Sequence, residues 1–211
     1  MLDAEIRPYT EKTLARLAQY LIVRGYTANM VTLLGAAMAV PAFLALMFQA
    51  YSVALGFILI NRLCDGLDGV IARHSKAGPT DFGGFLDIVM DFIFYGGVVF
   101  FFSLGQPESA AIAVFLLFSI MGTGSSFLAY AAIAEKRGMA VKKRQGKAFF
   151  QAGGLMEGTE TIIFFVLICL MPESFSLLAL IFSLLCWVTT FNRISEAYRS
   201  FIPVKNPDES A

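Results

Sequence analysis

Charged residues are scarce in this chain: they make up 15% of its 211 residues, whereas hydrophobic residues make up 57%. Soluble proteins have about a quarter charged and about half apolar residues, so this composition disfavours a soluble enzyme. The sequence has no proline-rich or serine-rich tract, which argues against a disordered chain. Basic and acidic residues number 16 each, so no excess charge supports nucleic-acid binding. The composition favours one polytopic membrane domain.

Cysteine and histidine are also rare, and their distribution fits neither a disulfide framework nor a zinc site. The three cysteines, Cys64, Cys169 and Cys186, stand alone in apolar surroundings, and no C-x-x-C pair occurs. We therefore expect them to be buried structural thiols. The single histidine, His74, is expected to be solvated in the loop after the second span rather than to act as a ligand.

Long uncharged runs, by contrast, are present. A helix needs about 20 largely apolar residues to cross about 30 Å of hydrocarbon. Residues 25–61 contain no Asp, Glu, Lys or Arg, and the polar segment 49–52 divides this run in two. The sequence predicts an all-α fold with six membrane spans, at residues 29–48, 52–73, 84–104, 109–134, 154–171 and 175–198.

The basic residues separate the two ends of these spans. All 16 Lys and Arg residues lie before the first span, late in the second or just after it, between the fourth and fifth, or at and beyond the end of the sixth. The three turns on the opposite side contain none. Lys and Arg concentrate in short cytoplasmic loops, so both termini are predicted to be cytoplasmic in an inner-membrane protein.

The first 24 residues differ from the rest because they mix charges with apolar residues at helical spacing, such as Leu14, Leu17 and Leu21. This pattern predicts an amphipathic helix lying at the cytoplasmic membrane surface. No short apolar core with a small-residue cleavage site is present, so we do not expect a cleaved signal peptide. The predicted organisation is an interfacial helix at 1–24, a six-helix transmembrane domain at 25–201 and a cytoplasmic tail at 202–211.

Four aspartates lie inside the predicted spans, where an ionisable residue costs at least about 2.5–3.5 kcal/mol on insertion scales and suggests a function. Asp65 and Asp68 are near the cytoplasmic end of the second span, and Asp87 and Asp91 are near the start of the third. Spacings of three and four residues put each pair on one helix face. Two consecutive helices joined by a short loop are antiparallel neighbours, so the carboxylates should face one another and need a positive partner. Hard divalent cations, Mg²⁺ or Mn²⁺, suit such all-oxygen ligands.

Two structural alternatives accompany this interpretation. The aspartates could instead form simple salt bridges with Arg62 and Arg73. The glycines beside them, Gly66, Gly69 and Gly83, either allow a ligand to approach the backbone or allow helices to pack closely. The two interpretations are equally good for Gly66, whereas ligand approach is favoured for Gly69 and Gly83.

The aspartates belong to a longer spaced motif. It reads Asp65-x2-Asp68-Gly69-x2-Ala72-Arg73, then nine residues, then Gly83-x3-Asp87-x3-Asp91. This motif resembles the signature of the CDP-alcohol phosphotransferase family, the integral-membrane enzymes of phospholipid synthesis. Residues 29–32 also resemble the family's first-span opening, although Ala28 stands where many members have proline. The nine-residue gap, where eight is commoner, falls in a loop that tolerates length.

The resemblance implies transfer of a phosphatidyl group from CDP-diacylglycerol to a small alcohol, with release of CMP. It implies that Asp65, Asp68 and Asp87 hold two divalent ions, Mg²⁺ or Mn²⁺, and that Asp91 shares in coordination and acts as general base. It further implies that Arg73 holds the diphosphate. The cytidine pocket would be lined by Gly66, Gly69, Ala72 and Gly83. Members are often dimeric, so a homodimer is compatible with the resemblance.

The acceptor alcohol is open. Lys142 and Arg144, in a basic loop, and Arg193, after a long uncharged run, suit the phosphate of a phosphorylated polyol such as glycerol 3-phosphate or an inositol phosphate. Positive-inside topology and anionic lipids explain the basic loop equally well. Glu157 and Glu160 suit polyol hydroxyls or an amine, which leaves serine or an amino alcohol open, or they pair with basic residues of neighbouring helices. We expect a phosphorylated polyol.

Two other functions are compatible with membrane aspartates. An intramembrane prenyltransferase of the UbiA type also binds diphosphate through magnesium, but it has about nine spans and its aspartate motifs lie far apart in sequence. A small cation transporter would line an ion path with acids. Against a transporter, the four aspartates cluster toward one side of the predicted membrane domain. The fourth and sixth spans contain no second acidic pair.

Overall fold

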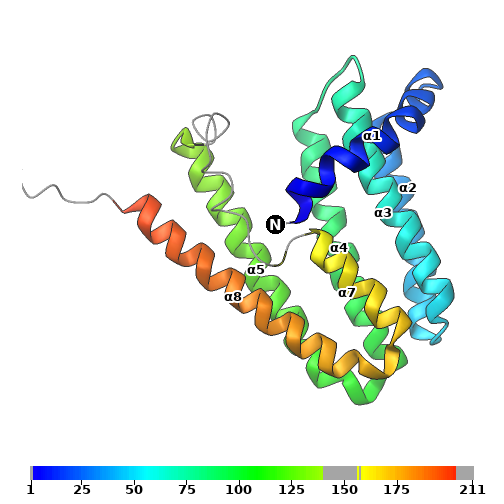
Figure 1. Ribbon diagram of the computed structural model, residues 1–211, viewed down its shortest axis with the longest axis vertical. Helices are drawn as coiled ribbons and strands as arrows, with labels where there is room; N and C mark the ends of the chain where they lie inside the picture. Colours follow the sequence, from blue (N-terminus) through cyan, green and yellow to red (C-terminus); the bar gives the residue numbers. More distant parts are fainter. Residues whose placement is uncertain (1, 140–155, 157, 203–211) are drawn as a thin grey trace, which may run out of the picture.

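Helices make up the regular structure of this protein in the computed structural model, which describes residues 2–139, 156 and 158–202 (Figure 1). They are α1 (Leu2–Val23), α2 (Ala28–Met47), α3 (Tyr51–His74), α4 (Asp81–Gly105), α5 (Ala110–Lys136), α7 (Gly158–Leu170) and α8 (Phe175–Phe201). Short 3-10 turns, η1 (Pro107–Ser109) and η3 (Pro172–Ser174), precede α5 and α8. No strand occurs in this described part, and the predicted all-α class is confirmed.

The helix limits follow the predicted spans to within about four residues, and two of the differences have a local explanation or bear on a predicted residue. Helix α4 begins at Asp81 rather than at residue 84, because Thr80 caps it: the Thr80 hydroxyl accepts the backbone N–H of Gly83 at 3.1 Å. The sequence suggested that His74 lies in the loop after the second span. In the structure it is the last residue of α3. It is exposed, and its Nδ1 lies 3.0 Å from the carbonyl oxygen of Val70.

Four helical stretches in the described residues are long and apolar enough to cross a membrane: Ala28–Met47, Asp81–Gly105, Pro107–Lys136 and Pro172–Phe201. Helix α3 has 24 residues but carries Arg62 at its middle and Asp65 and Asp68 in its second half. Helix α7 is described over 13 residues, a length of about 20 Å. The structure therefore supports four of the six predicted spans, and crossing by α3 and α7 remains a prediction.

The two ends of the helical bundle differ in charge. The α2–α3 turn, η1 and η3 all lie at one end, at the bottom of Figure 1. Side-chain amides join these turns: Gln49 donates to the carbonyl oxygen of Gly105 at 2.5 Å, and Gln106 donates to the Tyr51 hydroxyl at 2.8 Å. These turns contain no Lys or Arg. Among the described residues, the basic ones are therefore excluded from this end of the bundle, in agreement with the separation seen in the sequence.

Helix α1 crosses the opposite end of the bundle and packs against α3 (Figure 1). Ala18 is fully buried there, and Leu14 and Leu21 pack against a cluster that includes Leu67 and Val70 of α3. The segment predicted to be an amphipathic helix is therefore helical and in contact with the bundle. Its position at a membrane surface remains a prediction.

The interior between the helices is aromatic and contains the cysteines. Among the largest fully buried side chains are Phe94 and Phe102 of α4, Phe165 of α7 and Phe175 of α8. All three cysteines are buried and unpaired, as predicted. Helices α2 and α3 come close at Gly35, because a Cβ atom there would lie 2.9 Å from the Cβ of Cys64.

Adding a methyl group at that contact is expected to destabilise the protein. Gly35→Ala should lower the free energy of unfolding by about 1–3 kcal/mol, because overpacking forces neighbouring atoms to shift. Gly56→Ala is the matched control: it lies in α3 with nothing within 4 Å of the added Cβ, and helix propensity favours Ala by about 1 kcal/mol. Thermal unfolding in detergent measures both. A Gly35→Ala melting temperature at or above that of the unchanged protein would contradict the contact.

Candidate metal and substrate site

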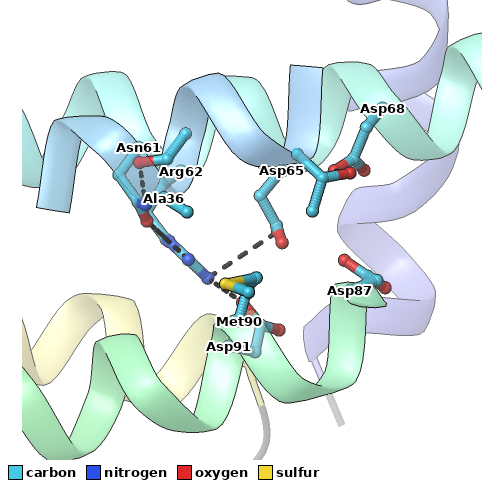
Figure 2. A pocket seen from close by; sticks show the side chains of 10 residues that line it. Ala36, Asn61, Arg62, Asp65, Asp68, Asp87, Met90 and Asp91 are labelled. Atoms are coloured by element: carbon cyan, nitrogen blue, oxygen red, sulfur yellow. Dashed lines mark hydrogen bonds and ion pairs between the residues drawn. The ribbon is translucent and has the colours of Figure 1, made fainter. Parts of the chain in front are cut away.

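Three aspartates from two helices converge in one pocket. Asp65 extends from α3, and Asp87 and Asp91 extend from α4 (Figure 2). One carboxylate oxygen from each lies within 4.8 Å of the others. Spacing by four residues puts Asp87 and Asp91 on one face of α4, and the short loop after α3 folds that face back against Asp65. The structure thus brings together three of the four aspartates singled out in the sequence.

Asp68 lines the same pocket but lies outside this close group of three. Its side chain is held by α2, because the Thr32 hydroxyl donates to its Oδ2 at 2.6 Å. Asp68 is 5% exposed, so this hydrogen bond satisfies an oxygen that water barely reaches. The sequence reasoning assigned no role to Thr32; the only signal was its position in the segment 29–32 that resembles the family's first-span opening.

Arg62 also belongs to this site, although the sequence indicated it only as an alternative salt-bridge partner of the aspartates. Its Nη1 lies 2.8 Å from Oδ1 of Asp91 and 3.7 Å from Oδ2 of Asp65. The salt-bridge alternative is therefore realised in part, by Arg62 and not by Arg73. Arg62 is the first charged residue after the run 25–61 and stands three positions before Asp65, and this spacing was the available signal.

The pocket has the donor set of a hard divalent cation. Its polar lining includes four carboxylates, the Arg62 guanidinium, Thr32 and Asn61. One guanidinium leaves three negative charges uncompensated when all four carboxylates are ionised, an arrangement that is costly away from water. Its volume of about 10 Å³ is near the minimum needed for one water-sized occupant, such as a cation. Oxygen ligands at this spacing fit Mg²⁺ or Mn²⁺.

Arg73, the residue predicted to contact the diphosphate, lies near the end of α3 and contacts α1. The Nε of Arg73 is 3.2 Å from Oε1 of Glu11, and both side chains are about one-third exposed, at 33% and 34%. Gly69 lies directly beneath this arginine, because a Cβ there would be 3.3 Å from Nη1 of Arg73. The two motif residues therefore lie against each other, as spacing by four residues predicts, and Ala72 is partly exposed beside them.

The other two motif glycines have different neighbours. A Cβ on Gly83 would lie 3.0 Å from Oγ1 of Thr80 and 3.1 Å from Oδ1 of Asn29. Gly83 therefore lies where the start of α4 meets Asn29 at the start of α2. A Cβ on Gly66 would lie 3.0 Å from Cδ1 of Leu14 in α1. That contact supports the helix-packing alternative for Gly66.

Two of the predicted acceptor residues, Arg193 and Glu160, lie in the described part of the chain, and neither lines the aspartate pocket. Lys142, Arg144 and Glu157 lie outside the described residues. Arg193 is 7% exposed in α8, and its Nη1 donates to the carbonyl oxygen and the hydroxyl of Thr123 in α5, at 2.8 and 3.0 Å. Glu160 lines an apolar groove between α7 and α8. The described residues place Arg193 and Glu160 on elements separate from the lining of the acidic pocket.

The motif and its geometry agree with a family model. Residues 25–192 match the model of the CDP-alcohol phosphatidyltransferases. The chain belongs to this family. It is 47% identical over 199 residues to the inner membrane protein YnjF of Escherichia coli, covering 94% of this chain and 96% of that protein. It is 26% identical over 195 residues to the archaetidylinositol phosphate synthase of Pyrococcus horikoshii, covering 92% and 95% respectively.

Solved structures share the fold. The phosphatidylinositol phosphate synthase PgsA1 of Mycobacterium tuberculosis, crystallised with CDP-DAG bound, superimposes with a TM-score of 0.71 at 18% identity, over 95% of this chain and 98% of that chain. Its complex with manganese and citrate gives a TM-score of 0.63 at 22% identity, over 94% and 92%. At 18% and 22% identity, these superpositions show that the fold is shared and do not by themselves assign a function.

The family assignment confirms the resemblance seen in the sequence. The protein is an enzyme of the metal-dependent CDP-alcohol phosphatidyltransferase class, and an aspartate cluster is present in its structure. Its apolar helices and its similarity to an inner membrane protein indicate an integral inner-membrane protein. This assignment replaces the prenyltransferase and transporter alternatives.

Proposed function

We propose that this protein transfers the phosphatidyl group of CDP-diacylglycerol to a phosphorylated polyol and releases CMP. The convergence of Asp65, Asp87 and Asp91, inside the segment that matches the family model, is the observation that carries this proposal. An aspartate pocket suited to divalent cations, lined in part by the helix that carries Gly69 and Arg73, supports a donor with a diphosphate group. The acyl chains of such a donor would remain in the bilayer.

The proposed metal ligands are the four aspartates of the pocket. Asp65, Asp87 and Asp91 hold one Mg²⁺ or Mn²⁺, and Asp68, oriented by Thr32, contributes to a second. Bound divalent cations neutralise charge on the diphosphate and orient it for in-line displacement. The fit of the donor set to hard cations supports this assignment.

The other motif residues bind the donor and move one proton. Arg73 presents a planar set of donors to the diphosphate, in exchange for its contact with Glu11. Gly66, Gly69, Ala72 and Gly83 line the cytidine pocket in this proposal. The acceptor hydroxyl oxygen forms a bond to the phosphorus next to the lipid while the bond from that phosphorus to the CMP oxygen breaks. The hydroxyl proton passes to Asp91.

A phosphorylated polyol is the acceptor that the sequence and the relatives favour together. The named relatives with a stated activity make inositol phosphate lipids, which supports an inositol phosphate beside glycerol 3-phosphate within this class. We propose that Arg193, with Lys142 and Arg144, binds the acceptor phosphate. Glu157 and Glu160 are proposed to contact the polyol hydroxyls.

The proposed topology follows the charge separation along the bundle. Six spans place the end with the basic residues, the aspartate pocket and both termini on the cytoplasmic side. Helix α1 lies at that surface as an interfacial helix over residues 1–24, the catalytic domain covers 25–201, and residues 202–211 form a tail. A homodimer remains a prediction from the family resemblance.

The experiment that tests the reaction is CMP release by the purified protein with CDP-diacylglycerol and Mg²⁺ or Mn²⁺. The acceptor panel is glycerol 3-phosphate, inositol, inositol phosphate, serine and choline. Metal-dependent release with a phosphorylated polyol alone is the expected result. Release with serine or choline would contradict the acceptor, and absence of both release and CDP-lipid binding would contradict the reaction.

Removing the Thr32 hydroxyl tests the proposed support of Asp68. Thr32→Val keeps the side-chain shape but deletes the 2.6 Å hydrogen bond, so Mn²⁺ affinity should fall by about tenfold, the lower end of the effects found for outer-shell partners. Titration of the purified protein with Mn²⁺ measures this. Thr190→Val is the control, because Thr190 is also buried but donates to Cys186 within α8. Equal affinities in the two variants would refute the role of Thr32.

A further inference from the structure

Arg62 is a cation built into the aspartate pocket rather than a surface partner of it. Its side chain is 8% exposed, and its Nη1 contacts two of the three clustered carboxylates. We propose that Arg62 competes with the divalent ion for the Asp91 carboxylate and so lowers the metal affinity of the protein without donor. This inference rests on the proposed function, because it assumes that the pocket binds a metal ion.

The guanidinium is anchored on the side away from the carboxylates. Its Nε and Nη2 both donate to Oδ1 of Asn61, at 2.8 and 2.5 Å. Asn61 is held in turn by its own donation to the carbonyl oxygen of Gly35 in α2, at 2.7 Å. The ring of Phe94 lies 4.5 Å from Cζ of Arg62, in range of a cation–π contact. These contacts aim Nη1 at the carboxylates (Figure 2).

Asp91 is the carboxylate for which the competition is direct. Its Oδ1 accepts from Arg62 at 2.8 Å, and its Oδ2 accepts from the Tyr95 hydroxyl at 3.3 Å. Both oxygens of this proposed metal ligand therefore already have protein partners. A metal ion that binds Asp91 must share or displace one of them, and the charged partner opposes the ion electrostatically as well.

The charges give the direction of the effect. Four ionised carboxylates and one guanidinium contribute −4 and +1, so the pocket carries −3 with Arg62 and −4 without it. A unit charge and a divalent ion about 5 Å apart repel strongly even at an effective dielectric constant of about 20. Removing the guanidinium charge should therefore tighten metal binding, at least about tenfold.

The test is a titration of the purified full-length protein in detergent with Mn²⁺ alone, followed by the paramagnetic resonance signal of free Mn²⁺. Arg62→Gln should lower the dissociation constant at least about tenfold. Arg62→Lys keeps the charge and should stay within about threefold of the unchanged protein. Arg24→Gln, which removes an arginine stacked on Tyr20 outside the pocket, controls for net charge and should have no effect.

Unchanged or weaker Mn²⁺ binding in Arg62→Gln overturns the inference, as does equal tightening in Arg62→Lys. Should Arg62→Gln fail to fold, the Mn²⁺ affinity of Asp91→Asn is compared with that of the double variant Arg62→Gln/Asp91→Asn. In this pair the Arg62 charge is removed without leaving the Asp91 carboxylate buried and unpaired. The double variant should then bind Mn²⁺ at least as tightly as Asp91→Asn, because competition through Asp91 is absent from both and only repulsion of the ion by the guanidinium remains. Weaker binding in the double variant overturns the inference. Failure of the unchanged protein to bind Mn²⁺ would instead refute the proposed metal site itself.

Discussion

Replacing Asp91 with asparagine should reduce CMP release by about 10²–10⁴-fold, the usual contribution of a general acid or base. Asparagine has nearly the same shape, and its amide oxygen can still accept from Arg62, but it cannot take the proton of the acceptor hydroxyl. Asp65, Asp68 and Asp87 remain, so much of the CDP-diacylglycerol binding should survive. The measurement is CMP release, with donor binding assayed separately on the same preparation.

The control for this variant is Asp81→Asn, on the same helix. Asp81 lies in the exposed first turn of α4 and does not line the aspartate pocket, so CMP release should be unchanged. Retained turnover in Asp91→Asn would eliminate Asp91 as the base. Loss of donor binding together with turnover would assign Asp91 to metal coordination alone.

Replacing Asp87 with asparagine should have the largest effect on metal binding. Asp87 contributes one of the three oxygens that lie within 4.8 Å of one another, and a neutral amide removes both the charge and the better ligand atom. The loss of Mn²⁺ affinity should exceed the about 10–100-fold that outer-shell changes cost, and activity should be lost with it. Titration with Mn²⁺ in the absence of nucleotide measures the effect.

Asp68→Asn provides the graded comparison. Asp68 lies outside the close group and is bonded to Thr32, so its replacement should weaken metal and donor binding less than Asp87→Asn does. Normal Mn²⁺ affinity in Asp68→Asn would remove this residue from the proposed ligands. A loss as large as that of Asp87→Asn would place Asp68 in the same ion site.

The sequence alone predicted the features that depend on local helix geometry. The uncharged runs predicted where α2, α5 and α8 lie, because hydrophobic length and helical rise are properties of one segment. Spacings of three and four residues predicted the shared faces of Asp65 with Asp68 and of Asp87 with Asp91. The full motif predicted the family, which the match over residues 25–192 confirms.

Within α3, however, the sequence could not tell which charged side chains would turn toward the pocket. Arg62 and Arg73 both follow helical spacing from the aspartates, yet one joins Asp91 and the other pairs with Glu11 of α1. The choice depends on Asn61, which is anchored to Gly35 of α2, and on how α1 crosses α3. Neither contact is visible in the α3 segment by itself.

The sequence by itself determined the helical class, the aspartate motif and the separation of charge along the chain, because each follows from the period of one helix or from composition. The tertiary structure decided that Asp68 is held by Thr32, that Gly66 faces Leu14 and that Arg62 occupies the acidic pocket. Each of these contacts joins residues of two different helices, and which faces meet depends on the packing of the whole bundle.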